Sequence, residues 1–116
     1  MRLTRNSKYS NVRTTVGDIK FASKAEARRY GELRLLEKAG QIRGLRLQPR
    51  FPLFVGEHLI CTYVGDFQYE EEPFGPSNDP AGKLVVEDVK GFKTDVYRIK
   101  RELLFATQGI AIREVK

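Results

Sequence analysis

Two carboxylates and a lysine interrupt residues 84–91, a run that otherwise has the apolar composition of a buried strand. Because side chains alternate across a strand, Asp88 and Lys90 point to one face and Glu87 points to the other. A carboxylate beside an amine can hold a metal ion and handle a proton. Burial of these charges without partners would cost several kcal/mol, so other elements should supply compensating groups.

Two further carboxylates could complete such a site. Asp66 interrupts the strand-like stretch 58–70, and Gly65 before it predicts a bulge or a close approach of the backbone. Glu26 lies on the apolar edge of a predicted helix, although it also fits a capping box that begins at Ser23. If the two strands are neighbours, their aspartates can reach one cation.

The composition restricts the metal chemistry. The single cysteine and the single histidine, Cys61 and His58, exclude an intramolecular disulfide and a Cys/His zinc site. A bound metal must therefore have oxygen ligands, which Mg²⁺ prefers in the form of carboxylates, waters and substrate phosphates. Hydrolysis of a phosphodiester needs an activated water, neutralised phosphate charge and a stabilised leaving oxygen, and these groups can supply all of them.

The bulk properties are those of one soluble domain, because the chain has 116 residues, of which 41% are hydrophobic and 31% charged. No apolar run approaches the length of a membrane span, and the first residues lack the apolar region of a secretion signal. We therefore expect a cytoplasmic protein without a membrane partner, in the host cytoplasm if a phage encodes it.

The net charge of +6 and the pI near 9.6 favour DNA as partner, although on charge alone a merely basic protein is an equal alternative. The distribution supports DNA, because basic residues follow the amino-terminal arm, the first helix and a cluster at 93–101, whereas acidic residues gather at 70–72 and 87–88. A solvated helix face is the alternative to phosphate contact for most of the candidates. The candidate DNA contacts are Arg29, Lys93, Thr94, Arg98 and Lys100.

Periodicity and capping signals place these residues on a few elements. Residues 1–20 are predicted as a basic arm that orders on a partner, and residues 21–116 as one domain. A helix should run from the Ser23 cap to Gly40, followed by a connector at 41–50. Paired strands are then predicted at 51–55 and 58–70, followed by a loop at 73–82 and a strand at 83–90. A second helix should run from Thr94 or Asp95 to Gly109, with an apolar stripe of Val96, Ile99, Leu103 and Ala106. A last strand is predicted at 110–115.

The order helix, three strands, helix, strand predicts an α/β domain with a mixed central sheet and a helix on each face. Together with the segments 23–30, 47–51 and 86–91, this order resembles the PD-(D/E)XK nuclease superfamily, which has a restriction-endonuclease-like α-β-β-β-α-β core. Within that superfamily, residues 21–112 are similar to a group of small phage-associated nucleases.

The resemblance implies a Mg²⁺-dependent DNA endonuclease that cuts phosphodiesters with a metal-activated water and in which Mn²⁺ substitutes. Asp66, Asp88 and the backbone carbonyl of Val89 would bind the metal, and Lys90 would be the catalytic lysine. Glu26 would bind a second cation or take the proton of the water. Members of this size include phage enzymes that resolve branched DNA as homodimers, so junction cleavage by a homodimer is a further expectation.

The chain departs from the usual motif at two positions, where Gly65 replaces a proline and Asp88 replaces a glutamate. Glu87 could be the ligand instead of Asp88, but only if a bulge turned it toward Lys90. Gln48 could hydrogen-bond in the site or only satisfy backbone groups. Two other functions stay open, namely a non-catalytic DNA-binding module and a packaging-associated protein whose basic arm binds a partner protein.

Overall fold

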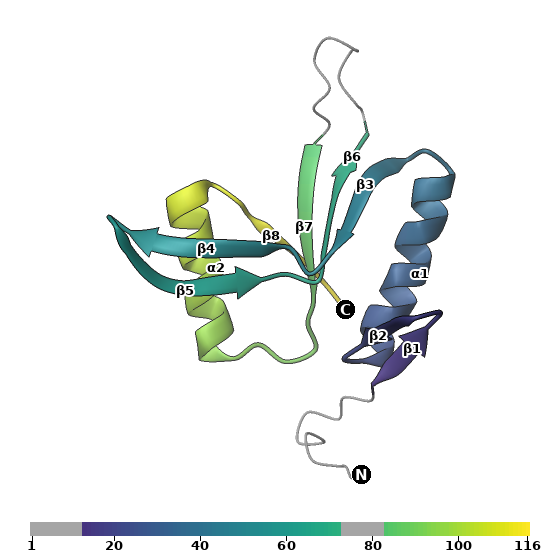
Figure 1. Ribbon diagram of the computed structural model, residues 1–116, viewed down its shortest axis with the longest axis horizontal. Helices are drawn as coiled ribbons and strands as arrows, with labels where there is room; N and C mark the ends of the chain where they lie inside the picture. Colours follow the sequence, from purple (N-terminus) through teal and green to yellow (C-terminus); the bar gives the residue numbers. More distant parts are fainter. Residues whose placement is uncertain (1–12, 73–82) are drawn as a thin grey trace.

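The structure, a computed structural model, describes residues 13–72 and 83–116 (Figure 1). The predicted loop at 73–82 and residues 1–12 of the predicted arm lie outside the described residues. Neither described helix is long and apolar enough to span a membrane. The elements in chain order are β1 (Thr14–Val16), β2 (Ile19–Phe21), α1 (Lys24–Lys38), β3 (Ile42–Leu47), β4 (Arg50–Val55), β5 (His58–Val64), β6 (Phe67–Glu71), β7 (Lys83–Val89), α2 (Asp95–Gln108) and β8 (Ile112–Val115).

The central sheet has the strand order β3-β6-β7-β8. The pairs β3–β6 and β6–β7 are antiparallel, whereas β7 and β8 are parallel and are joined through α2. With α1 before β3, the elements of this core follow one another as α-β-β-β-α-β. The predicted α/β class with a mixed central sheet is therefore confirmed.

The first strand of the central sheet is β3, a segment that the sequence predicted as a connector. Its pairing with β6 shifts register between Arg43 and Arg46, and Gly44 between them has a φ of +69°. This bulge breaks the period-two alternation of apolar residues by which a strand is recognised in a sequence. The connector prediction was wrong for that reason.

The predicted strand at 58–70 divides at Gly65. Its first part, β5, pairs with β4 in the predicted hairpin, while its second part, β6, lies in the central sheet. A Cβ atom on Gly65 would lie 3.1 Å from Val86 Cγ1 and 3.3 Å from Pro49 Cγ, which confirms the predicted close approach. The Gly65 N–H also donates to the Pro49 carbonyl at 3.0 Å, a bond that proline could not make.

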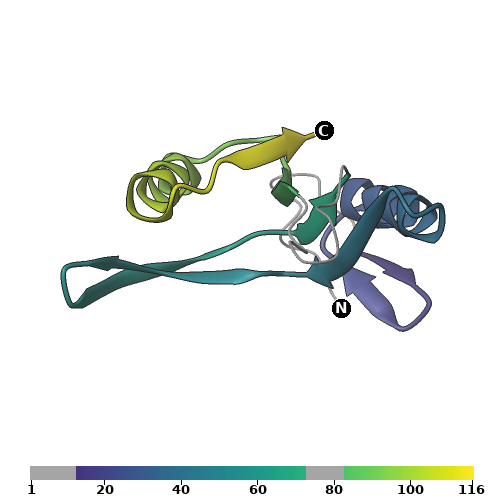
Figure 2. The same ribbon diagram turned by 90° about the horizontal axis from the view of Figure 1, so that it is seen from above.

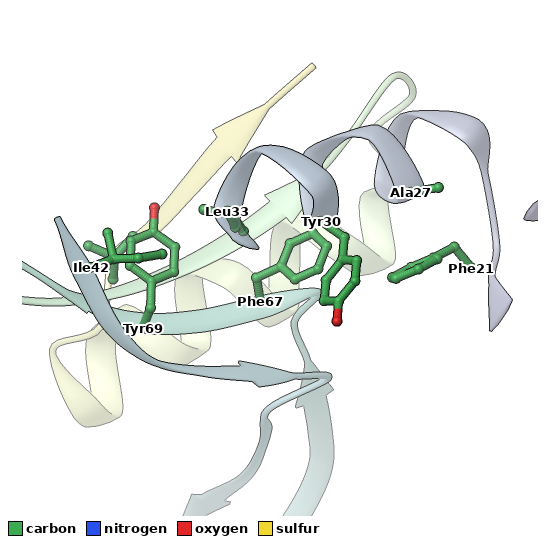
Figure 3. Close-up of a cluster of buried hydrophobic side chains, with 8 residues drawn as sticks. Phe21, Ala27, Tyr30, Leu33, Ile42, Phe67 and Tyr69 are labelled. Atoms are coloured by element: carbon green, nitrogen blue, oxygen red, sulfur yellow. The ribbon is translucent and has the colours of Figure 1, made fainter. Parts of the chain in front are cut away.

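Helix α1 begins as the capping box predicts, since the Ser23 hydroxyl accepts from the Glu26 N–H at 3.1 Å. The helix covers one face of the central sheet (Figure 3). The buried cluster between helix and sheet contains Phe21, Ala27, Tyr30, Leu33, Ile42, Phe67, Tyr69 and Val85. This cluster holds the first turn of α1 at the end of the sheet where β6 begins and β7 ends.

Helix α2 packs against the β4–β5 hairpin and does not cover the second face of the sheet as predicted (Figure 2). Their shared core consists of Leu53, Tyr63, Tyr97 and Leu104. Most of the predicted stripe faces outward instead, with Val96 62% and Ile99 66% exposed, whereas Leu103 is partly buried against this core. Because α2 has apolar residues on more than one face, its sequence did not determine which face would be buried.

Residues 14–21 form a hairpin, β1–β2, that contacts α1. Val16 pairs with Ile19, so Gly17 and Asp18 are the two turn residues, and Gly17 has the positive φ of +60° that such a tight turn requires. Phe21 is buried and Ile19 packs against the same cluster. The part of the predicted arm that the structure describes is therefore folded onto the domain.

Candidate functional site

Asp66 is held at the point where the chain enters β6. Its N–H donates to the Glu87 carbonyl at 3.0 Å, and its Oδ2 accepts from the Val89 N–H at 2.7 Å. Because Phe67 pairs with Glu87, these bonds place Asp66 beside the segment that carries Asp88. Burial is the main reason why the pKa of Asp66 is raised.

Asp88 and Lys90 share a face of the chain, as alternation predicts. Lys90 Nζ lies 3.5 Å from Asp88 Oδ1 and 4.6 Å from the centre of the Tyr97 ring, so the amine is fixed between a carboxylate and an aromatic face. Asp88 is 1% exposed, and its Oδ2 has no hydrogen-bond partner in the described part of the chain. Burial raises the pKa of Asp88 to about 6.

Glu26 approaches the two aspartates from the first turn of α1. Its pKa is raised to about 7, first by burial and then by the negative charge of Asp66, with a smaller contribution from Asp88 and an opposing one from Lys90. Glu26 therefore lies within electrostatic reach of Asp66, Asp88 and Lys90. Three separate elements thus bring together Glu26, Asp66, Asp88 and Lys90.

A pocket of about 110 Å³ lies in front of Glu26 and Asp66. Its other polar lining residues are Lys20, from β2, and Gln48, from the β3–β4 junction. The sequence did not indicate Lys20 as a site residue, because its place depends on the β1–β2 hairpin. The lining residues are Ile19, Lys20, Phe21, Glu26, Leu47, Gln48, Asp66 and Phe67.

The donor set fits a hard divalent cation. Among the described residues, no group of three or more acidic, histidine or cysteine side chains is placed to hold a metal ion. Mg²⁺ does not need one, because it keeps several waters and binds through one or two carboxylates. The unpaired, buried Oδ2 of Asp88 and the carboxylate of Asp66, which accepts from the N–H of the next residue, Val89, would make such a partial set. The backbone of Val89 lies next to Asp66 through its N–H, and metal binding by its carbonyl stays a prediction.

Glu87 faces α1 and has a different role. It is 0% exposed and accepts two bonds from the Arg29 guanidinium, at 2.8 Å from Nε to Oε1 and 2.6 Å from Nη2 to Oε2. The Tyr69 hydroxyl donates to the same carboxylate. The β6–β7 pairing continues through Glu87 without a register shift. The alternative in which Glu87 replaces Asp88 as ligand therefore does not hold.

Arg29 was predicted to contact DNA, but its guanidinium binds Glu87 and, at 2.9 Å, Glu32. The side chain is 20% exposed, so the structure assigns it to a bridge between α1 and β7. A charged residue in an apolar strand requires such a partner, yet Arg29 and Glu87 are 58 positions apart. The sequence showed the need for a partner without showing which basic residue would meet it.

The other predicted DNA contacts divide into two groups. Lys93 and Arg98 line an open cleft of about 510 Å³ that begins at Lys90 and also contains Lys116 and Glu114. Lys93 Nζ lies 3.0 Å from Glu114 Oε1 within this cleft.

Thr94 and Lys100 have structural contacts. The Thr94 hydroxyl accepts from the Tyr97 N–H at 3.0 Å and caps α2. Lys100 Nζ donates to the Thr62 carbonyl at 3.3 Å and ties α2 to β5. Neither side chain is therefore as available for phosphate as the sequence suggested.

Residues 6–116 match the family described as "Protein of unknown function (DUF1064)". The chain belongs to this family. No curated protein and no solved structure matches it. Every residue of the acidic site and of the basic cleft lies within the part of this DUF1064 chain that the family covers.

The chemistry open to this DUF1064 protein follows from the charges. Burial raises the pKa of all three site carboxyl groups, so their ionised forms are disfavoured and a cation between them would be stabilised. Lys90 adds a fixed positive charge at one side, and the cleft continues that charge along the surface. The arrangement can bind a divalent cation, accept a proton at Glu26 and hold an anionic ligand.

Proposed function

We propose that the chain is a Mg²⁺-dependent endodeoxyribonuclease that hydrolyses phosphodiester bonds, with Mn²⁺ as a substitute. The observation that carries this proposal is the convergence of Glu26, Asp66, Asp88 and Lys90 beside a buried, unpaired carboxylate oxygen. The sequence and the geometry support the same four residues for independent reasons. The spacing of these residues along the chain made them candidates, and their burial and electrostatic interactions relate them in three dimensions.

Asp66 and Asp88 would hold the metal ion, with the carbonyl of Val89 as an additional ligand. Bound there, Mg²⁺ would supply a polarised water and neutralise charge on the phosphate. Lys90 would bind a non-bridging phosphate oxygen, and the Tyr97 ring limits where its amine can move. Glu26, whose pKa is about 7, is suited to accept a proton near neutral pH.

The cleft beside Lys90 supports DNA as the polyanion. Lys93, Arg98 and Lys116 lie along it, so a strand with one phosphate at Lys90 would find positive charge for the next phosphates. Neutralising phosphates releases counterions, which makes the affinity fall as salt is added. A chain with a net charge of +6 would bind DNA of any sequence through this surface.

We also propose that two copies associate through the outer face of α2, as cleavage of a branched junction would require. Val96, Ile99, Leu103 and Ala106 repeat at spacings of three and four, which is the seam of a helix pair. The groove along this seam is lined by Ile99, Leu103 and Ala106 and flanked by Arg98 and Glu102. In an antiparallel pair the same apolar face of α2 would meet its copy, so the face is complementary to itself.

The test of catalysis uses wild type, Asp88→Asn and, as a matched control, Asp95→Asn in the exposed first turn of α2. Linear, single-stranded and branched DNA are incubated with and without Mg²⁺. We expect Mg²⁺-dependent cleavage by wild type and Asp95→Asn and a loss of at least about 100-fold for Asp88→Asn. Equal background cleavage by all three proteins would reject the proposal. Salt-dependent DNA binding that survives Asp66→Asn and ignores Mg²⁺ would then favour a non-catalytic DNA-binding module.

A further inference from the structure

Gln48 has an unfavourable backbone conformation. Its φ is +50°, and it is the one non-glycine residue in the described ranges with a positive φ. Left-handed backbone is costly for a residue with a side chain, because Cβ approaches the following carbonyl oxygen. At the other positive-φ positions that the structure describes, the chain has glycine: Gly17, Gly40, Gly44, Gly56 and Gly109.

The backbone of Gln48 does not explain why a glutamine is present. Its N–H donates to the Asp66 carbonyl at 3.0 Å, which fixes the chain where it leaves β3 for the hairpin. Glycine would make the same bond and adopt the same conformation with less strain. The chain therefore has a side-chain amide at a position where it costs backbone strain, which is a pattern found at functional positions.

Gln48 lines the same pocket as Glu26 and Asp66. The bond from Gln48 N to the Asp66 carbonyl joins its backbone directly to a proposed metal ligand. An amide offers an acceptor oxygen without a charge that would repel phosphate or bind metal competitively. Gln48 is the neutral polar residue in the lining of this pocket, so its amide can direct a water molecule there.

We propose that Gln48 is a positioning residue that orients the attacking water in the proposed hydrolysis, an inference that depends on the proposed function. The water has two protons, of which Glu26 accepts one while Gln48 Oε1 accepts a hydrogen bond from the other. Its free electron pair then points toward phosphorus. The water oxygen bonds to phosphorus, the bond to the leaving oxygen breaks, and that oxygen takes a proton from solvent.

The experiment compares Gln48→Met and Gln48→Gly with Gln41→Met. Methionine keeps the length of the side chain and its Cβ but loses the amide, and glycine also removes the backbone strain. Gln41 is an exposed glutamine directly before β3, whereas Gln48 directly follows that strand. Gln41→Met therefore controls for the loss of an amide elsewhere. Thermal unfolding, Mn²⁺ affinity by calorimetry, kcat and KM for cleavage are measured for each protein.

We expect both Gln48 variants to lose about tenfold or more in kcat, with KM and Mn²⁺ affinity within about twofold of wild type. Gln48→Gly should keep the wild-type Tm or exceed it by up to about 5 °C. Gln41→Met should match wild type throughout.

Wild-type kcat in both Gln48 variants, while Asp88→Asn is inactive, would overturn this inference and leave the proposed function intact. A Tm of Gln48→Gly well below wild type would also overturn it, because the glutamine would then be required by the fold. If wild type itself neither cleaves DNA nor binds Mn²⁺, the proposed function fails and the role of Gln48 fails with it.

Discussion

The buried ion pair between Arg29 and Glu87 permits a quantitative prediction. Arg29→Met replaces the guanidinium by an apolar side chain of similar length and leaves the Glu87 carboxylate, 0% exposed, with the Tyr69 hydroxyl as a donor. Removing one partner of a buried pair costs about 3–5 kcal/mol, because the remaining charge is not compensated. Since a domain of this size is stable by about 5–15 kcal/mol, this change removes a large part of the total.

Urea denaturation at pH 7 and 25 °C measures the effect as a lower midpoint at unchanged slope. The matched control is Glu32→Gln, which removes the other partner of the same arginine. The Glu32 side chain is 53% exposed, so its loss should cost no more than about 1 kcal/mol. The double variant Arg29→Met, Glu87→Leu should recover most of the loss, because no buried charge remains.

A cost below about 1 kcal/mol for Arg29→Met would refute this reasoning, because the pair would then behave as a surface ion pair. A double variant as unstable as Arg29→Met would refute it as well.

Four further predictions concern the pH dependence of stability, the metal, the DNA and the helix seam. Burial raises the pKa of Asp88 from its usual 3.8 to about 6. The free energy of unfolding of the wild type should therefore fall as the pH rises from the lower of these values to the higher, and that of Asp88→Asn should fall less. Mg²⁺ should raise the wild-type Tm more at pH 8 than at pH 5.5, where a proton competes for the carboxylate, and equal shifts in a thermal scan would contradict this. Arg98→Ala should lower the slope of log Kd against log salt by about 1 in a DNA-binding titration, whereas an unchanged slope would place the strand elsewhere. Ile99→Asp should convert a dimer to a monomer in light scattering without a change in circular dichroism, and a wild type that is monomeric at high concentration would reject the seam.

The sequence determined the features that depend on a few neighbouring residues. Strand alternation placed Asp88 and Lys90 on one face, and the structure has them 3.5 Å apart. The capping box located the start of α1, since its bonds join residues three apart. Gly65 marked a close approach because only glycine lacks the Cβ that would meet Val86. The first two constraints act within the local backbone and the third follows from the residue type at one position, so a linear reading can find them.

Tertiary packing decided the features that depend on distant partners. β3 is a strand because β6 pairs with it across a bulge that hides its pattern. Glu87 binds Arg29, 58 positions away, and this pair forms a bridge between α1 and β7 that the sequence did not indicate. Helix α2 buries Tyr97 and Leu104 because the β4–β5 hairpin lies on that side. In each case several local solutions had similar energies, and burial against a distant segment selected one of them.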